Sequence, residues 1–204
     1  MAWVTPDTVF TLGQKINVTD METIGNDLQY LYDNSGEKRK DLSLMAANPP
    51  LGTVLPAAAV ELVTAGTVTT TNYPAWYQAR FDGTVNEGRM WNFSMPMNFA
   101  GTPVIKISYN SGTASVAGST TVWGVQVAAV SNTDLWYGKT FSGDNRGTST
   151  IVGTAYVMNQ ATVTVLDYDN AVALDNLCVL LYRAGTVDTF NGDAVVTKVE
   201  MFYT

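Results

Sequence analysis

The sequence predicts an all-β protein with a short N-terminal helix, in which an antiparallel β-sandwich of the jelly-roll type takes up most of the chain. The first observation is the composition: 46% of the 204 residues are hydrophobic and only 14% are charged, as in a turn-rich β globule. The second is the spacing of short apolar runs, which recur roughly every ten to fifteen residues from about residue 54 onward. The third is the C-terminal stretch, where two long β-rich runs end the chain.

The first 18 residues mix apolar side chains with turn signals such as Pro6 and Gly13, and they are too irregular to form a core. Their apolar side chains therefore need another surface, and we expect this arm to dock on a partner or a sister subunit. The side chains expected to do so are Trp3, Val4, Val9, Phe10, Leu12 and Ile16.

A short helix is predicted next. Thr19 is its N-cap candidate, and Glu22 completes a capping box three residues later. Apolar residues then recur at the spacing of a coiled-coil seam for about two heptads. These residues are Met21, Ile24, Leu28 and Leu31. The pattern indicates a subunit seam, although an amphipathic helix that packs on its own domain fits it equally well.

Two segments after this helix are expected to lack regular structure. The charged run 37–41 has the composition of a solvated turn, and the proline-rich segment 48–52 that of an extended linker. We therefore divide the chain into an N-terminal attachment arm and oligomerisation helix, residues 1–50, and a β-sandwich, residues 54–204.

Nine strands are expected in the second part, at 60–70, 75–81, 89–94, 104–109, 121–130, 149–157, 161–166, 177–183 and 194–203. The run 177–183 is apolar at both alternating sets of positions, which indicates a strand buried on both faces. The run 194–203 alternates more clearly and indicates a half-buried strand. Eight or nine such strands in roughly 150 residues fit a two-sheet sandwich.

Several function classes are excluded by composition. The net charge is −7 and basic residues do not cluster beyond the run 37–40, so we expect no nucleic-acid partner. An apolar run long enough to cross a membrane is also missing, so no membrane partner is expected. The sequence contains no histidine and one cysteine, Cys178, which is expected to be a small buried side chain. Without histidine the common catalytic triads and most zinc sites cannot form, so we expect neither an enzyme nor a cofactor.

Two polar groups near the C-terminus have structural and functional interpretations. Asp167 and Asp169, with Asp175 nearby, place oxygen ligands at alternating positions, which could hold Ca²⁺. The expected explanation is a loop whose Asx side chains bond their own backbone, and we assign no metal site. Arg183 ends an apolar strand and is expected to pair with Asp188 or Asp193 and so close the last loop.

Aromatic residues offer two alternatives. Those at strand positions could form a platform on which sugars stack, but more often such residues belong to the core. They are Trp76, Trp91 and Trp123, with Tyr73 and Tyr77. Trp136 and Tyr137 differ, because they are adjacent in an expected loop and cannot both point inward easily. We expect them to contact a subunit or a ligand.

Two parts of the chain resemble proteins of tailed-phage virions. The elements Ala2-Trp-Val-Thr-Pro6, Gly13, Ile16-Asn-Val-Thr-Asp20 and Asn26-Asp-Leu-Gln-Tyr-Leu31 resemble the N-terminus of many such proteins, with Asp27 as a departure from their pattern. The segments 91–96, 104–109, 122–125 and 177–183, with Asp188 and 192–194, resemble a phage structural β-sandwich. The resemblance implies a head fibre, capsid decoration or tail protein without catalytic activity, and trimeric assembly is frequent among such proteins.

The expected function is therefore that of a non-enzymatic virion structural protein. We expect a homotrimeric capsid decoration or head-fibre protein, made in the host cytoplasm and attached to capsid or tail proteins through its N-terminal arm. The alternative is a tail-associated receptor-binding protein that recognises a host surface glycan. A glycan-degrading depolymerase has the least support, because no pair of carboxylates lies in a recognisable catalytic context.

Overall fold

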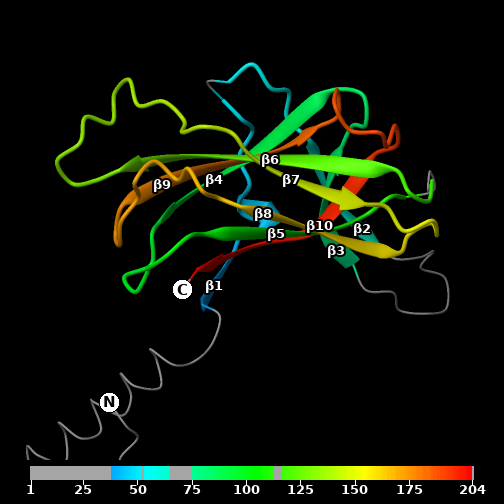
Figure 1. Ribbon diagram of the computed structural model, residues 1–204, viewed down its shortest axis with the longest axis horizontal. Helices are drawn as coiled ribbons and strands as arrows, with labels where there is room; N and C mark the ends of the chain where they lie inside the picture. The colour runs from blue at the N-terminus through cyan, green and yellow to red at the C-terminus, as the bar shows by residue number, and fades with distance from the viewer. Residues whose placement is uncertain (1–37, 52, 65–74, 113–115, 204) are drawn as a thin grey trace, which may run out of the picture. The chain divides into compact units, whose positions relative to one another are not determined.

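The computed structural model describes residues 38–203, except for 52, 65–74 and 113–115 (Figure 1). The chain divides into two compact units, Met1–Lys38 and Arg39–Thr204, and the second is the β domain. The predicted helix and arm lie outside the described residues. The same is therefore true of Trp3, Val4, Val9, Phe10, Leu12, Ile16, Met21, Ile24, Leu28 and Leu31.

Two sheets form the β domain. The six-stranded sheet has the order β2-β3-β10-β5-β8, with β1 also paired to β10. Its strands are β1 (Lys38–Asp41), β2 (Ala59–Thr64), β3 (Ala75–Phe81), β5 (Val104–Asn110), β8 (Met158–Thr164) and β10 (Ala194–Tyr203). The four-stranded sheet has the order β4-β9-β6-β7. Its strands are β4 (Asn86–Ser94), β6 (Thr120–Val130), β7 (Asn145–Thr150) and β9 (Asn176–Ala184).

The strand order is that of a jelly roll. Every neighbouring pair from β2 to β10 is antiparallel, and the chain crosses between the sheets so that β3-β10-β5-β8 faces β4-β9-β6-β7. The predicted antiparallel sandwich is thus confirmed. Among the described residues, no helix is long and apolar enough to cross a membrane.

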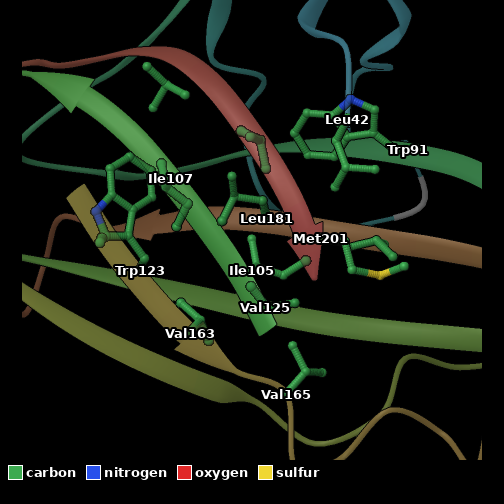
Figure 2. Close-up of a cluster of buried hydrophobic side chains, with 14 of the residues drawn as sticks. Leu42, Trp91, Ile105, Ile107, Trp123, Val125, Val163, Val165, Leu181 and Met201 are labelled. Carbon is green, nitrogen blue, oxygen red and sulfur yellow. The ribbon is translucent and has the colours of Figure 1, made fainter. Parts of the chain in front are cut away.

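The core lies between the two sheets because each strand turns one alternating set of apolar side chains inward. On β5 the set is Ile105, Ile107 and Tyr109, all fully buried. The Trp123 ring of β6 packs edge-on against Tyr109 and against Phe81 of β3, with ring centroids 5.5 and 5.2 Å apart. Figure 2 shows the β5 and β6 side chains among others of this core.

A buried ion pair closes the loop between β9 and β10. The Arg183 Nε atom donates to Asp188 Oδ2 at 2.7 Å, and neither side chain is exposed. Arg183 also donates to the carbonyl oxygens of Phe81, Phe190 and Gly192. The expected pairing of Arg183 with Asp188 is confirmed, whereas Asp193 pairs with another arginine.

The segment 38–50 differs from its prediction. Residues 38–41 form strand β1 rather than a solvated turn, and residues 39–50, assigned above to the N-terminal part, belong to the β domain. Leu42 and Leu44 enter the core, where Leu42 lies near Trp91 (Figure 2). The Trp91 indole donates to the Ser43 carbonyl oxygen at 2.9 Å. Strand β1 consists of four consecutive charged residues, KRKD, and has no apolar alternation, so the sequence pattern concealed it.

Strand β7 was also misplaced, since it spans Asn145–Thr150 instead of 149–157. Its sequence, NRGTST, carries no large apolar side chain, because β7 is an edge strand that pairs only with β6. Asn145 is the first residue of β7. Its side-chain amide donates to the carbonyl oxygens of Val125 and Asp167 and so holds the start of the strand in place. Ile151, inside the predicted range 149–157, is buried just beyond the end of β7.

Candidate functional site

A groove of 1110 Å³ crosses the outer face of the six-stranded sheet. It exists because residues that alternate with the core positions point away from the core: on β3, Ala79 and Phe81 are buried, whereas Gln78 and Arg80 are not. The residues lining the groove come from all five strands of the main order and from two loops. They are Val63, Trp76, Gln78, Arg80, Ser108, Asn110, Gly112, Tyr156, Met158, Val195, Thr197 and Lys198.

Strand pairing sets the direction of the groove. Val63 of β2 lies opposite Trp76, Val195 of β10 lies opposite Arg80, and Asn110 of β5 lies opposite Met158 of β8. The groove therefore runs across the strands, over the four strand boundaries from β2 to β8. At about 4.8 Å for each boundary, this distance is about 19 Å. A hollow of this volume and length can hold an extended ligand.

Large side chains remain exposed toward both ends of the groove. Trp76, beside the edge strand β2, is 53% exposed, and Tyr156, just before β8, is 65% exposed. The backbone of Tyr156 has a φ of 60°, which is uncommon for a bulky residue, and its amide donates to the Gly112 carbonyl oxygen at 3.0 Å. Such conformations persist where the surrounding structure holds them, often at binding sites.

The charged residues of the groove are paired with carboxylates at its border. Arg80 lies 3.1 Å from Glu61 and 3.6 Å from Asp193, and the Gln78 amide donates to the same Glu61 oxygen at 3.3 Å. The hydrogen bond to Glu61 raises the pKa of Arg80 above its ordinary value, so Arg80 stays charged. Lys198 lies 2.7 Å from Glu200.

The lining combines aromatic faces with amide, hydroxyl and cationic hydrogen-bonding groups. Among the described residues that line the groove, none is an aspartate or a glutamate. A glycosidase needs two carboxylates that flank the bond to be cleaved. The arrangement is therefore suited to binding a polyhydroxylated molecule.

Trp136 and Tyr137 lie elsewhere, in the loop between β6 and β7, and this loop projects beyond the strands in yellow-green in Figure 1. They and Leu135 are 77%, 87% and 86% exposed, respectively. Two contacts of Lys139 hold this loop in place. Its ammonium group lies 3.0 Å from the Asp169 carboxylate, and its backbone amide donates to the Trp136 carbonyl oxygen at 3.3 Å. We call residues 135–137 the loop tip. It does not contribute to the groove lining.

The acidic group considered for Ca²⁺ accepts hydrogen bonds from backbone amides. Asp167 accepts the amides of Gly143 and Asp169, and Asp169 accepts the amide of Ala129. Asp175 accepts the amide of Val172. In the part of the chain that the structure describes, no three acidic, cysteine or histidine side chains converge on a metal position.

The aromatic residues divide between core and surface. Trp91 and Trp123 are buried, whereas Trp76 and Tyr77 are exposed, and Tyr73 lies outside the described residues. The sequence pattern missed the other lining residues. Alternation along 75–81 and 104–109 could have shown that Gln78, Arg80 and Ser108 face outward, but only the strand order brings these residues together.

Comparisons with known proteins give distant structural likenesses only. No protein-family model matches the sequence, and no curated protein matches it. Among solved structures, a CBM35 module from Cellvibrio japonicus shares 14% identity with a TM-score of 0.41, covering 80% of this chain and 92% of its own. A carbohydrate-binding module specific for non-crystalline cellulose, CBM28, shares 10% identity with a TM-score of 0.42, covering 76% and 86%.

A third solved structure, the xylan-binding module CBM15, shares 15% identity with a TM-score of 0.38 and covers 83% of this chain and 98% of its own. At these values the likeness identifies neither a ligand nor a binding residue of the present chain. The groove of the six-stranded sheet is therefore the feature of the β domain that bears on its function.

Proposed function

We propose that the β domain is a non-catalytic carbohydrate-binding domain that holds a glycan in the groove of the six-stranded sheet. The observation that carries this proposal is the groove lining: Trp76 and Tyr156 are exposed on opposite sides of a floor that contains Gln78, Arg80 and Asn110.

The physical reason is the two-sided character of a sugar ring. Its C–H faces lose contact with water when they stack on an aromatic ring, and its hydroxyl groups need hydrogen-bonding partners around the edge. Aromatic rings toward the two ends would hold separate sugar units, and the planar amide and guanidinium groups between them would bond hydroxyls. Such a mixed lining is usual for ligand sites.

We place this binding domain on a virion, where it would recognise a glycan of the host surface as part of a tail-associated protein. That setting is supported by the resemblance of the N-terminal elements around Trp3 and Ile16 to virion proteins. A capsid decoration or head fibre is compatible with the same elements, and the groove favours the receptor-binding role, because decoration alone requires no ligand groove.

The test uses the full chain, a panel of immobilised polysaccharides, and two single variants. W76A removes an aromatic face from the groove, whereas W136A removes an exposed tryptophan outside it and is a matched control. We expect W76A to weaken binding at least about tenfold, which corresponds to about 1.4 kcal/mol. W136A should bind like the unaltered protein. Equal affinity of W76A and the unaltered protein would place the glycan elsewhere, and a chain that binds no polysaccharide would refute the function.

The loop tip supports a second function, a contact with other protein subunits. Three consecutive large apolar side chains are almost fully exposed there, and such patches commonly mark interaction surfaces. We propose that the tip strengthens the homotrimer expected from Met21, Ile24, Leu28 and Leu31. In light scattering, the variant L135S/W136S/Y137S should dissociate at a higher concentration than the unaltered protein. Identical dissociation of both proteins, or a protein that is always monomeric, would exclude this role.

A further inference from the structure

We propose that the groove selects uncharged glycan chains over polyanionic ones, because carboxylates at its border act as built-in counter-ions for its cations. This inference rests on the proposed glycan-binding function and names the class of glycan. It concerns three carboxylates, Glu61, Asp193 and Glu200, and two cations, Arg80 and Lys198.

Arg80 is the residue best suited to recognise a carboxylate or sulfate on a sugar, since a guanidinium can bind such a group with two parallel hydrogen bonds. In the structure each of its two terminal nitrogens faces a carboxylate: Nη2 lies 3.1 Å from Glu61 and Nη1 lies 3.6 Å from Asp193. An anionic sugar would have to displace at least one carboxylate that is already in place. A neutral hydroxyl can instead accept a further hydrogen bond without separating charges.

The second cation, Lys198, shares a buried carboxylate with another cation. Lys198 lies 2.7 Å from Glu200, and Arg39 of β1 lies 3.2 Å from the same Glu200 oxygen. Lys106 of β5 is placed over the Phe202 ring, 4.0 Å from its centroid. Glu200 is almost fully buried, and these two ion pairs compensate its charge. A ligand in the groove therefore cannot easily separate Lys198 from Glu200.

The balance of charge opposes a polyanion at longer range as well. Arg80 with Glu61 and Asp193 carries a net charge of −1, Lys198 and Arg39 with Glu200 carry +1, and the whole chain carries −7. Charges act over about 8–10 Å at physiological salt, so a polyanion laid over Arg80 would meet the carboxylates of Glu61 and Asp193. A neutral chain would keep the stacking on Trp76 and Tyr156 without this repulsion.

The first test compares polymers that share a backbone and differ in charge, namely hydroxyethyl cellulose with carboxymethyl cellulose, and dextran with dextran sulfate. The full chain should bind the neutral member of a pair at least about tenfold more tightly. Raising NaCl from about 0.05 to about 0.5 M should leave the affinity for the neutral polymer nearly unchanged. Tighter binding of the anionic member, weakened by salt, would overturn the inference.

The second test removes the counter-ions. In E61Q/D193N, Arg80 has no carboxylate partner, so affinity for the anionic polymer should rise about tenfold. The control D41N/D134N removes the same number of charges from exposed positions outside the groove and should change little. E61Q alone, which keeps Asp193, should give a smaller gain. Equal behaviour of E61Q/D193N and the control would overturn the inference.

The outcomes separate this inference from the proposed function. Binding that depends on Trp76 but favours the anionic polymers would refute the charge selection and retain the glycan-binding groove. Absence of binding to every polymer, neutral and anionic, would refute the proposed function and the inference together.

Discussion

Arg183 of β9 has no exposed surface, and its charge is balanced entirely inside the protein. Replacing it in R183M would leave the Asp188 carboxylate buried without its partner, and three carbonyl oxygens would lose a donor. We expect urea titration to show a loss of about 3–5 kcal/mol in the free energy of unfolding.

The matched control for this prediction is Arg146, whose pair with Asp144 is at the surface. R146M should cost less than about 1 kcal/mol, because water already screens that pair. If R183M were as stable as R146M, the buried network would contribute nothing measurable to the stability of the fold.

Tyr182 leads to a prediction about alkaline pH. Burial and the Asp144 carboxylate, to which its hydroxyl donates at 2.7 Å, raise the pKa of Tyr182 to about 12. In the unfolded chain this tyrosine ionises near its ordinary value of about 10, so the unfolded state binds fewer protons between these two values. Stability should therefore fall as pH rises from 10 toward 12.

The measurement is urea titration at several alkaline pH values for the unaltered protein and for Y182F, which keeps the ring but cannot ionise. The loss of stability with rising pH should be smaller in Y182F. Parallel pH profiles for the two proteins would mean that Tyr182 titrates alike in the folded and unfolded states.

At the scale of single elements, Gly147 of β7 is placed where the edges of the two sheets meet. A Cβ atom at this position would lie 2.2 Å from the backbone oxygen of Thr162 in β8, and backbone cannot move aside easily. At Gly124 of β6, a Cβ atom would instead meet the side-chain ring of Tyr182 at 2.3 Å. A side chain can rotate, although this one would lose its hydrogen bond to Asp144.

We therefore expect G147A to lower the free energy of unfolding by about 2 kcal/mol or more and G124A by a smaller amount. Thermal unfolding of the two variants beside the unaltered protein measures the difference. A more stable G147A than G124A would show that β7 and β8 separate more easily than the structure indicates.

The elements that the sequence predicted well are those with a clear apolar alternation. The bounds of β3 and β10 match their predictions, since Ala79 and Phe81 on one strand and Val199 and Met201 on the other all face the core. Strand β1 was not predicted, and β7 was predicted too late in the sequence, because each pairs with one strand only and carries no large apolar side chain. Apolar alternation along a sequence indicates which side chains are buried, and these two strands bury few side chains.

For the site, the sequence identified residue types but not their assembly. Trp76 was a candidate for sugar stacking beside several other aromatic residues, and nothing local distinguished it from the buried Trp123. The difference comes from the strand order, which pairs β3 with β10 and β10 with β5 and so places Trp76, Lys198 and Asn110 on one face. Residues so distant in sequence come together only through the strand order of the whole sandwich, which no local pattern predicts.

At the scale of the whole molecule, the first strand decides where the β domain begins. β1 pairs with β10, the Leu42 amide donates to the Val199 carbonyl oxygen at 2.9 Å, and Leu44 is buried. The structure starts the β domain at about residue 38, whereas the sequence pattern starts it at residue 54. The two boundaries predict different stabilities for chains truncated at these residues.

A chain that starts at residue 38 retains β1, Leu42 and Leu44, so its melting temperature should stay close to that of the full chain. A chain that starts at residue 54 loses both leucines, and burial of each contributes roughly 1.5–3 kcal/mol. It also loses the Ser43 carbonyl that accepts from Trp91. We expect it to be less stable by about 3–6 kcal/mol, a large part of the stability of a domain this size. Thermal and urea unfolding of the two truncated chains measure this directly. Equal stability would mean that residues 38–53 only lie against the sandwich, and that the later boundary describes the folding unit correctly.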